Sequence, residues 1–498
     1  MMLSSDLSSL HSIVPQTKWS ALQKEAVSTL TSQFTVSTTK LQQLTEAFVQ
    51  HMNEGLTAQK GASKDLAMIP TYVTGRPDGH ERGSYLALDL GGTNLRVCLI
   101  TLKGDHALES HQRAFKVSDH LQEAHVSELM DFIAASIKDF ITSEHISAKI
   151  VEHPSDSETL ELGFTFSFPV TQTAIDAGVL LRWTKGFCCP GAVGNDVVQL
   201  LQEALNRNGV NVHVAALVND TVGTLLAHSY THPNTFVGAI FGTGTNGAYV
   251  ETARNIPSIS SPAKEMLVNI EWGNFDKDKE FLPLTIHDNK LDRESINPGV
   301  HVFEKMISGM YLGEIARNVL LNLIDQRILF GGVSSEILNK HYALETKFMS
   351  DIEKDTSSTL TATATILEQE LNIRNSTVAD REIVKTVCQL VGNRAARLSA
   401  MATAAVIRQG LSNGIQEKHR HLLRVGVTAV SAVDEKDVIN VGIDGSVFEH
   451  YPYFEDRMTE GLEELLGPNA RHIINLGIAR DGSGVGAALA ALIATKNS

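Results

Sequence analysis

Two stretches of this chain share one pattern, and that pattern restricts the possible folds more than any other feature. Residues 84–101 (SYLALDLGGTNLRVCLIT) and 237–251 (VGAIFGTGTNGAYVE) each have an apolar run, a glycine turn with Thr and Asn, and a second apolar run. Short apolar runs bounded by glycine turns are typical of buried strands. Two such hairpins, each opening a region of strands and helices, predict a duplicated α/β fold with a cleft between its halves.

Other strands and helices fit this plan. Buried strands are predicted at 160–170, where Pro169 ends the apolar run, and at 212–218, which leads directly into a helix at 221–230. Apolar residues at steps of three and four predict a helix at 37–56. Further signals are a charged, turn-rich stretch at 275–297, a long helix after Pro298, another glycine hairpin in NVGIDGSVFEH (440–450), and a strand, glycine turn and closing helix at 472–495.

The chain is long enough for two large domains, with 498 residues. We expect residues 1–82 to form a helical segment that packs on the larger domain. We expect the smaller domain at 83–218, completed by 481–498, and the larger domain at 219–480.

Composition excludes several classes of protein. The net charge is −15, from 42 Lys and Arg against 57 Asp and Glu, whereas a nucleic-acid binder needs a basic surface. The N-terminus lacks a basic region followed by an apolar one, and no stretch approaches 18 apolar residues. We therefore expect a soluble, intracellular protein without nucleic-acid or membrane partners. The cysteines (Cys98, Cys188, Cys189 and Cys388) lack CxxC spacing, which predicts reduced thiols.

The glycine turns are candidate phosphate sites. Residues 91–94 (GGTN), like Thr243 and Gly244 in the second turn, let the backbone approach a ligand and present N–H donors. Asp89, at the end of the preceding strand, could hold a water of a Mg²⁺ shell. Either turn alone could be an ordinary hairpin, but two in one chain favour a nucleotide. GSGVG (482–486) is not a dinucleotide motif, because no strand follows its helix.

Several polar residues have both a catalytic and a structural interpretation. Asn219-Asp220 lies at a strand-to-helix junction, where an active-site carboxylate is common and a helix N-cap is equally expected. Glu271 is either a site residue or a charge at a strand end, and Glu304 is either a site residue or a partner of a helix dipole. WTKGF (183–187) could be only a turn.

A series of motifs in fixed order resembles the eukaryotic hexokinase family, and most closely its fungal glucokinase branch. The motifs are LDLGGTNLRV, GFTFSFPV with LLRWTKGF, LVNDTVGT, IFGTGTNGAYVE, NIEWGNFD, FEKMISGMYLGE and DGSGVGAAL, from about residue 40 to the end. The resemblance implies the actin-like ATPase (ribonuclease H-like) fold, with a small and a large domain around a central cleft. It implies phosphorylation of a hexose 6-hydroxyl by ATP with Mg²⁺, the first step of glycolysis, in the cytoplasm. Glucose would be preferred, mannose also used and fructose used less, by a monomer or homodimer.

The resemblance also assigns site residues. Asp220 resembles the family's catalytic base, with Lys185 as a second catalytic residue. The implied sugar contacts are Ser167, Thr184, Lys185, Asn219, Asp220, Asn246, Glu271 and Glu304. The implied nucleotide contacts are Asp89 (through water to Mg²⁺), Gly91, Gly92, Thr93, Asn94, Arg96, Thr243, Gly244, Ser446 and Gly484.

One departure from the family pattern concerns the sugar site. After NPG the family usually has a pair of glutamines, whereas this chain has Val300 and His301. His301 either modulates Glu304, three residues further along a helix, or points to solvent. Two other functions remain open: a catalytically weak sugar sensor on the same fold, and an actin-like or chaperone-type ATPase without sugar chemistry. The retained base, lysine and glycine turns favour catalysis.

Overall fold

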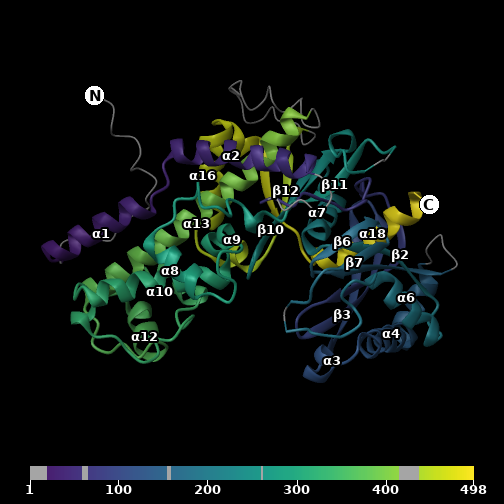
Figure 1. Cartoon of the computed structure of the whole chain (residues 1–498), viewed down its shortest axis with the longest axis horizontal. Helices are drawn as coiled ribbons and strands as arrows, with labels where there is room; N and C mark the ends of the chain where they lie inside the picture. The colour runs from purple at the N-terminus through teal and green to yellow at the C-terminus, as the bar shows by residue number, and fades with distance from the viewer. Residues whose placement is uncertain are drawn as a thin grey trace.

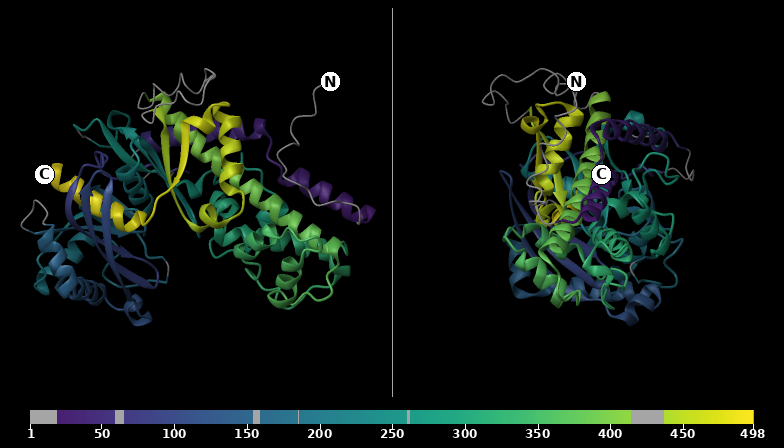
Figure 2. Two further views of the ribbon diagram at one scale, coloured as in Figure 1. Left: turned by 180° about the vertical axis from the view of Figure 1, so that it is seen from behind. Right: turned by 90° about the vertical axis from the view of Figure 1, so that its left-hand side faces the viewer.

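The computed structural model describes residues 19–58, 65–153, 159–184, 186–259, 262–413 and 437–497. Two large β-sheets, each covered by helices, lie side by side along the molecule (Figure 1), and β6 (Val170–Ala174) and β7 (Ala177–Leu180) form a separate two-stranded sheet. Helix α1 lies at the end of the molecule far from the five-stranded sheet (Figures 1 and 2). Within the described part of the chain, no helix combines the length and apolar character needed to cross a membrane.

The five-stranded sheet has the order β4-β3-β2-β5-β8. Its strands are β2 Arg82–Leu90, β3 Asn94–Gly104, β4 Ala107–Lys116, β5 Leu160–Phe166 and β8 Val212–Val218. The first three form an antiparallel meander. Strand β5 pairs in parallel with β2, and β8 pairs in parallel with β5. Leu86 and Leu88 belong to one core cluster and Ala87 to the other, so β2 is buried on both faces. This explains its uninterrupted apolar sequence.

The six-stranded sheet has the order β1-β11-β10-β9-β12-β13. Its strands are β1 Ile69–Pro70, β9 Thr235–Phe241, β10 Thr245–Thr252, β11 Glu265–Asn269, β12 Ile439–Asp444 and β13 Ile474–Ile478. Strands β9, β10 and β11 form an antiparallel meander. Strand β12 pairs in parallel with β9, and β13 pairs in parallel with β12. This repeats the plan of the first sheet, which confirms the predicted duplication.

Two helices connect the sheets. Helix α7 (Asp220–Thr231) packs on β9 and β12, α18 (Gly482–Asn497) packs on β2, β5 and β8, and the two helices contact each other. A Cβ on Gly486 would lie only 2.1 Å from the carbonyl oxygen of Gly223, so glycine at this crossing permits the close approach. Figure 2 shows α18 lying against the strands of the smaller sheet.

The remaining elements cover the sheets or extend the larger half. Helix α13 (Val378–Ser412) is buried along most of its length and contacts α1, α2, α10, α11 and α16. The other elements are α1 Ala21–Phe34, α2 Thr38–Thr57, α3 Asp119–Glu123, α4 Val126–Thr142, α5 Glu144–Glu152, β6 Val170–Ala174, β7 Ala177–Leu180, α6 Val197–Arg207, α8 Ile286–Glu294, α9 Val302–Ile307, α10 Gly309–Asp325, α11 Thr346–Lys354, α12 Thr361–Gln369, α15 Ser446–His450, α16 Phe454–Leu466 and α17 Ala470–Ile473.

Most sequence predictions of elements are confirmed, including both hairpins, the strand at 212–218 and the helix that follows it. The single long helix after Pro298 is wrong: extended backbone at Ser308 (φ −95°, ψ 152°) separates α9 from α10. NVGIDGSVFEH is a strand followed by helix α15 rather than a hairpin. The strand predicted at 160–170 ends at Phe166, before Pro169. Helices α8 and α13 were not predicted.

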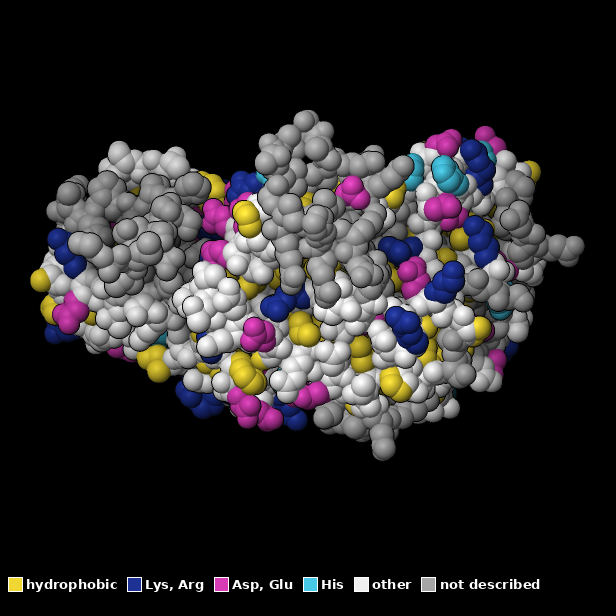
Figure 3. Space-filling view, turned by 90° about the horizontal axis from the view of Figure 1, so that it is seen from above, with side chains coloured by type: hydrophobic (Ala, Val, Ile, Leu, Met, Phe, Trp, Pro, Cys, Tyr) yellow, Lys and Arg dark blue, Asp and Glu magenta, His cyan; other side chains and the backbone are white. Residues whose placement is uncertain are grey.

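The surface and the cysteines agree with the composition. On the face in Figure 3, acidic and basic side chains are interspersed. All four cysteines are free thiols, as predicted. The domain boundaries proposed from the sequence stay predictions.

Candidate active site

A cavity of about 330 Å³ lies where the two halves meet. It is lined from both sides by predicted site residues: Asp89, Gly91 and Ser167 from the smaller half, and Asp220, Thr243 and Ser446. A neighbouring cavity of about 520 Å³ shares Thr243 and Ser446 with it. The two glycine turns, distant in sequence, therefore border one continuous region.

Asp220 enters the cavity from the junction of β8 and α7. The N-cap of α7 is Asn219, whose Oδ1 accepts a hydrogen bond from the Thr221 N–H at 2.9 Å. Asp220 is the first helical residue; its Oδ1 also accepts from the Thr221 N–H, at 2.8 Å. The capping interpretation thus applies to Asn219, while the Asp220 carboxylate lines the cavity.

A second group of predicted residues is connected by hydrogen bonds on the larger half. Asn246 Nδ2 donates to Glu271 Oε1 at 3.1 Å, and Asn269 Nδ2 donates to the same oxygen at 2.8 Å. Glu304 Oε2 accepts from the Thr245 N–H at 3.0 Å, next to the second glycine turn. These bonds orient two carboxylates whose free lone pairs can accept hydrogen bonds from hydroxyl groups.

Burial perturbs both carboxylates. Desolvation raises the pKa of Glu271, opposed by the hydrogen bond from Asn269 and reinforced by the negative charges of Asp220 and Glu304. Desolvation likewise raises the pKa of Glu304, opposed by the Thr245 N–H. The influence of Asp220 on Glu271 places the two groups in one electrostatic environment. Glu271 and Glu304 line neither of the two cavities. Carboxylates with perturbed pKa values are nevertheless more frequent at functional sites than elsewhere.

His301 lies against these acceptors. Its Nδ1 is 3.6 Å from Glu304 Oε1, and its side chain is 31% exposed. Burial lowers the pKa of His301, opposed by Glu271 and reinforced by the nearby positive charge of Arg182. A positive φ of 56° at the N-cap of α9 turns the chain into the helix. His301 therefore lies beside the predicted sugar residues and does not simply point away from them.

The first glycine turn is bordered by a cluster of charged side chains. Arg96 Nη2 donates to Asp89 Oδ2 at 2.6 Å, and Arg96 Nη1 donates to Asp481 Oδ1 at 3.2 Å. The hydroxyl of Ser483 donates to Asp89 Oδ2 at 2.9 Å. The cluster thus connects β2 and β3 to the start of α18. Asp481 and Ser483 were not predicted from the sequence.

Asp444 is a further residue that sequence reasoning missed. It ends β12, lines the cavity, and has its pKa raised by burial and by the charges of Asp220 and Asp481. The available signal was an apolar strand followed by Asp and Gly (VGIDG), similar to LALDLGG around Asp89. Within the described ranges, no group of three His, Cys, Asp or Glu residues could ligate a metal directly. Separate carboxylates around a cavity suit Mg²⁺, which keeps several waters and binds substrate phosphates.

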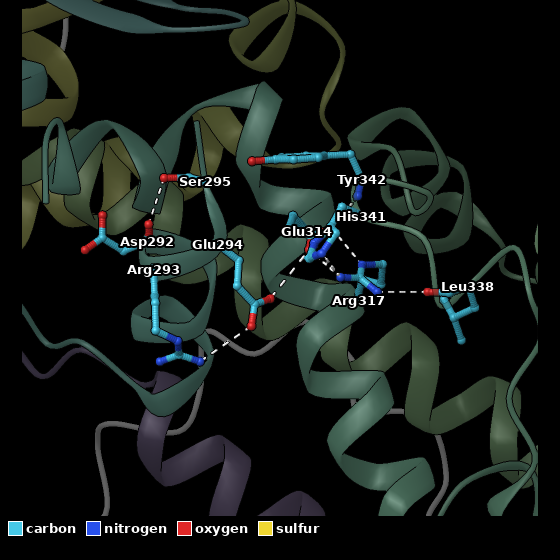
Figure 4. Close-up of polar contacts among 9 residues, drawn as sticks. All are labelled: Asp292, Arg293, Glu294, Ser295, Glu314, Arg317, Leu338, His341 and Tyr342. Carbon is cyan, nitrogen blue, oxygen red and sulfur yellow. Dashed lines mark hydrogen bonds and ion pairs between the residues drawn. The ribbon is translucent and has the colours of Figure 1, made fainter. Parts of the chain in front are cut away.

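The larger cavity has a wall made by α10 and the segment before α11. Its lining includes Gly309, Met310, Tyr342, Leu344 and Thr346. Figure 4 shows the side chains behind this wall, where Arg317 and Glu314 of α10 meet His341 and Tyr342. None of these four residues was predicted as a site residue, although Glu314 belongs to the motif FEKMISGMYLGE.

The other predicted residues have the following positions. Gly92, Thr93 and Asn94 form the first turn, which is closed by a hydrogen bond from Gly91 N to Asn94 O. The Thr184 carbonyl accepts from Phe187 N in the turn after β7, and Thr184 lines neither of the two cavities. Gly484 is inside the first turn of α18, beside Asp481. Lys185 lies outside the described residues.

A duplicated α/β fold with two glycine turns at a shared cavity is typical of the actin-like ATPase fold, and the buried carboxylates suit a kinase that acts on a hydroxyl substrate. Two family models, each described as hexokinase, match residues 26–230 and 236–493. The chain is 40% identical to a glucokinase of Aspergillus niger, over 96% of this chain and 98% of the relative. It is 42% identical to hexokinase-1 of Spinacia oleracea, over 91% and 87%.

Solved structures agree with these relatives. A hexokinase from Schistosoma mansoni complexed with glucose superimposes with a TM-score of 0.78 and 33% identity, covering 94% of this chain and 99% of that one. The chain belongs to the hexokinase family, the ATP-dependent kinases of hexoses. The resemblance drawn from the sequence and the actin-like ATPase fold that it implied are confirmed.

Proposed function

We propose that this chain transfers the terminal phosphoryl group of ATP to the 6-hydroxyl of glucose, with Asp220 as the general base. The observation that carries the proposal is the shared cavity, in which Asp220 lies with residues of both glycine turns. The reaction would be the first step of glycolysis, in the cytoplasm, by a monomer or a homodimer. Mannose would also be accepted, and fructose less well.

The sugar would be held by acceptors that match its hydroxyl groups. Glu271 and Glu304 are connected to Asn246 and Thr245 and keep acceptor capacity for hydroxyl donors. Charge-assisted hydrogen bonds of this kind are stronger than neutral ones. Ser167, Thr184, Lys185 and Asn219 complete the proposed sugar contacts. A hexose with a different hydroxyl pattern would leave a buried carboxylate unpaired, which gives strong discrimination.

Phosphoryl transfer requires positioning and neutralisation of charge more than covalent chemistry. The Asp220 carboxylate would accept the proton of the 6-hydroxyl as the oxygen attacks the terminal phosphorus of ATP and ADP leaves. Backbone N–H groups of the turns at residues 91–94 and 243–244, with Arg96, Lys185, Ser446 and Gly484, would hold the phosphates. Asp89 and Asp444 would hold Mg²⁺ through water, and the bound ion would supply positive charge to the phosphate oxygens.

The domain arrangement is part of the proposal. Residues 83–218 with 481–498 would move as the small domain, 219–480 as the large domain, and 1–82 would stay packed on the latter. Support comes from the two sheets and from contacts of α2 with α13 and α16. The crossing of α7 and α18 at Gly223 and Gly486 would act as the pivot.

A coupled assay of ADP release tests the function directly. We expect ADP release that depends on glucose, with little release in its absence, and slower turnover with fructose. A sugar sensor would bind glucose without turnover, and an ATPase without sugar chemistry would release ADP at the same rate with and without sugar. Either result would overturn the proposal.

A further inference from the structure

The segment SGMYLGE (308–314) is the part of its motif to which the proposed sugar and phosphate contacts give no role. It forms the start of α10, and its two ends contact different parts of the nucleotide region. At the start of the helix, Gly309 N donates to Gly242 O at 2.7 Å and Met310 N donates to Thr243 O at 3.1 Å. The beginning of α10 is therefore attached directly to the second glycine turn.

One turn further along, the same helix holds the wall of the larger cavity. A Cβ on Gly313 would lie 1.9 Å from the carbonyl oxygen of Leu344, so only glycine allows this approach. Gly313 N donates to Thr346 Oγ1 at 3.0 Å, and that hydroxyl donates to Gly309 O at 2.6 Å. The wall and the glycine turn are thus both fixed to α10.

Glu314 makes the charged contact in this arrangement. Its Oε2 accepts from the backbone N–H of Tyr342 at 2.6 Å and from Arg317 Nε at 2.7 Å. Its Oε1 accepts from Arg317 Nη2 at 2.5 Å, and Arg317 Nη1 donates to Leu338 O at 3.0 Å. Both side chains are only 2% exposed. Figure 4 shows this pair between α10 and the segment 338–342.

A second contact that holds residues 338–342, made by His341, is weaker. His341 Nδ1 is 3.4 Å from Glu314 Oε1 and 4.0 Å from Glu294 Oε2 at the end of α8, and its side chain is 56% exposed. Exposed ion pairs of this kind contribute little, whereas a buried backbone N–H without its acceptor is costly. Among the charged contacts, Glu314 therefore contributes most to the position of the wall, in addition to the hydrogen bonds of Thr346.

We propose that Glu314 is a positioning residue for the nucleotide: its carboxylate, oriented by Arg317, holds the Tyr342–Thr346 wall against α10 at the correct distance from the second glycine turn. This inference rests on the proposed function, because it assigns the larger cavity to the nucleoside part of ATP. Glu314 lines neither of the two cavities. Its effect should therefore appear in ATP affinity and leave glucose affinity unchanged.

The test compares two double variants with a matched control. Glu314→Leu/Arg317→Met removes both charges and the acceptor for Tyr342 N–H, whereas Glu314→Gln/Arg317→Met keeps an amide oxygen as acceptor. The control is Asp288→Leu/Arg394→Met, because Asp288 and Arg394 form a similarly buried pair, 3% and 0% exposed, between α8 and α13. Asp288 also accepts from a backbone N–H, that of Thr285 at 2.7 Å, but lines neither cavity.

We expect Glu314→Leu/Arg317→Met to raise the KM for ATP about tenfold, the scale of one lost buried acceptor, with the KM for glucose changed less than about twofold. The Gln/Met variant should recover most of that loss. The control should lower thermal stability without changing either KM. Equal shifts in both KM values, no shift in the KM for ATP, or the same ATP shift in the control would overturn the inference.

A single isosteric variant covers the case in which the Leu/Met variant does not fold. Glu314→Gln should fold and raise the KM for ATP, because one amide oxygen cannot replace two carboxylate oxygens. Loss of folding in Glu314→Gln under conditions where Asp288→Asn folds would assign Glu314 to stability alone and overturn the inference. Wild type without glucose-dependent ADP release would instead contradict the proposed function, and so the two failures are distinguishable.

Discussion

The two glycine turns share a backbone plan but have different surroundings. Each is closed by a short backbone hydrogen bond, Gly91 N to Asn94 O at 2.9 Å and Gly242 N to Gly244 O at 3.0 Å. The first turn is bordered by the partly exposed charges of Asp89, Arg96 and Asp481. The second is attached to buried elements, through the start of α10 and the carboxylate of Glu304.

This difference indicates how the two glycine turns of a duplicated fold can acquire different roles. The turns themselves offer the same backbone N–H donors, so their neighbours decide what each one does. Partly exposed charges around the first turn suit phosphates and a hydrated cation. Buried contacts around the second turn give it a further role beside the proposed phosphate contact, the orientation of sugar acceptors and of the nucleoside wall. Mutations, pH profiles and scattering measurements test this division of roles.

The largest effect is expected for Asp220, which lies between the two turns. Asp220→Ala should lower kcat by about 10²–10⁴-fold, the usual scale for a positioned general base. Glucose binding, measured by calorimetry, should change far less than turnover. Stability should also change little, because Asn219 carries the N-cap of α7. Near-normal kcat with a lower melting temperature would show that Asp220 serves only the helix.

A matched pair of glycine substitutions compares the turns directly. A Cβ on Gly244 would lie 2.8 Å from Glu304 Oε2, whereas a Cβ on Gly91 would meet its nearest atom, Asn94 O, at 3.2 Å. Gly244→Ala should displace the Glu304 carboxylate and raise the KM for glucose roughly 10–100-fold, the scale of one or two lost charge-assisted bonds. Gly91→Ala should leave the KM for glucose nearly unchanged. Steady-state kinetics of both variants decides; the reverse ranking would contradict the division of roles.

A smaller effect is expected from pH at the second turn. Burial raises the pKa values of Glu271 and Glu304, so these carboxylates are protonated at a higher pH than exposed glutamates. Burial lowers the pKa of His301, which therefore gains its charge only below the usual value of about 6.5. Both changes weaken the acceptors for sugar hydroxyls as pH falls. The kcat/KM for glucose should therefore decrease several-fold toward acid pH.

His301→Gln separates the two contributions. A neutral side chain beside Glu304 cannot attract that carboxylate by charge, so the acid decrease should begin at a lower pH than in wild type. Profiles of kcat/KM for glucose, mannose and fructose from pH 5.5 to 8 measure this. Superimposable profiles for glucose would remove His301 from the site, and equal use of fructose would defeat the preference for glucose.

The smallest effect is expected in the overall dimensions of the molecule when glucose binds. The proposed sugar contacts lie on both halves, so bound glucose should draw the domains together and exclude water. Small-angle scattering should give a smaller radius of gyration with glucose than without. Gly223→Ala, which adds a methyl group beside Gly482 O at 2.7 Å, should reduce that change. An unchanged profile in wild type would defeat the proposed closure.

Much of the fold was predictable because local pattern and tertiary structure agree. The strand at 212–218 and the two hairpins are confirmed, since buried strands between glycine turns carry a continuous apolar signal. Helix α13 was missed, because a helix buried on all sides lacks an apolar face opposite a polar one. The break at Ser308 was missed for another reason. The local signal is a single glycine, Gly309, directly after Ser308, and one glycine does not by itself end a helix. The backbone leaves the helix there because Gly309 N and Met310 N bond to the second turn.

The residues of the candidate site also differ in how far the sequence alone could predict them. Residues in short motifs, such as Asp89, Asp220 and Glu271, could be selected from the sequence with the help of a family resemblance. Asp444 was missed although VGIDG resembles the sequence around Asp89, because its significance depends on a cavity lined by six separate segments. Asp481 was missed because its significance depends on the contact with Arg96, a residue remote in sequence. The Glu314–Arg317 pair gave no local signal at all, since the atoms that it holds belong to residues 338–342.

The repeated strand–turn–strand plan and the family follow from the sequence alone, which also supplied the residues proposed to do the chemistry. Those properties depend on side-chain type and on spacings of a few residues, where hydrogen bonding and apolar periodicity act locally. The folded structure was needed to show that Asn219, and not Asp220, is the N-cap of α7. It was also needed to show that His301 lies 3.6 Å from Glu304 and that α10 contacts both the second turn and the nucleoside wall. Distances between remote segments and the burial that shifts a pKa arise only from packing of the whole chain, which no local pattern encodes.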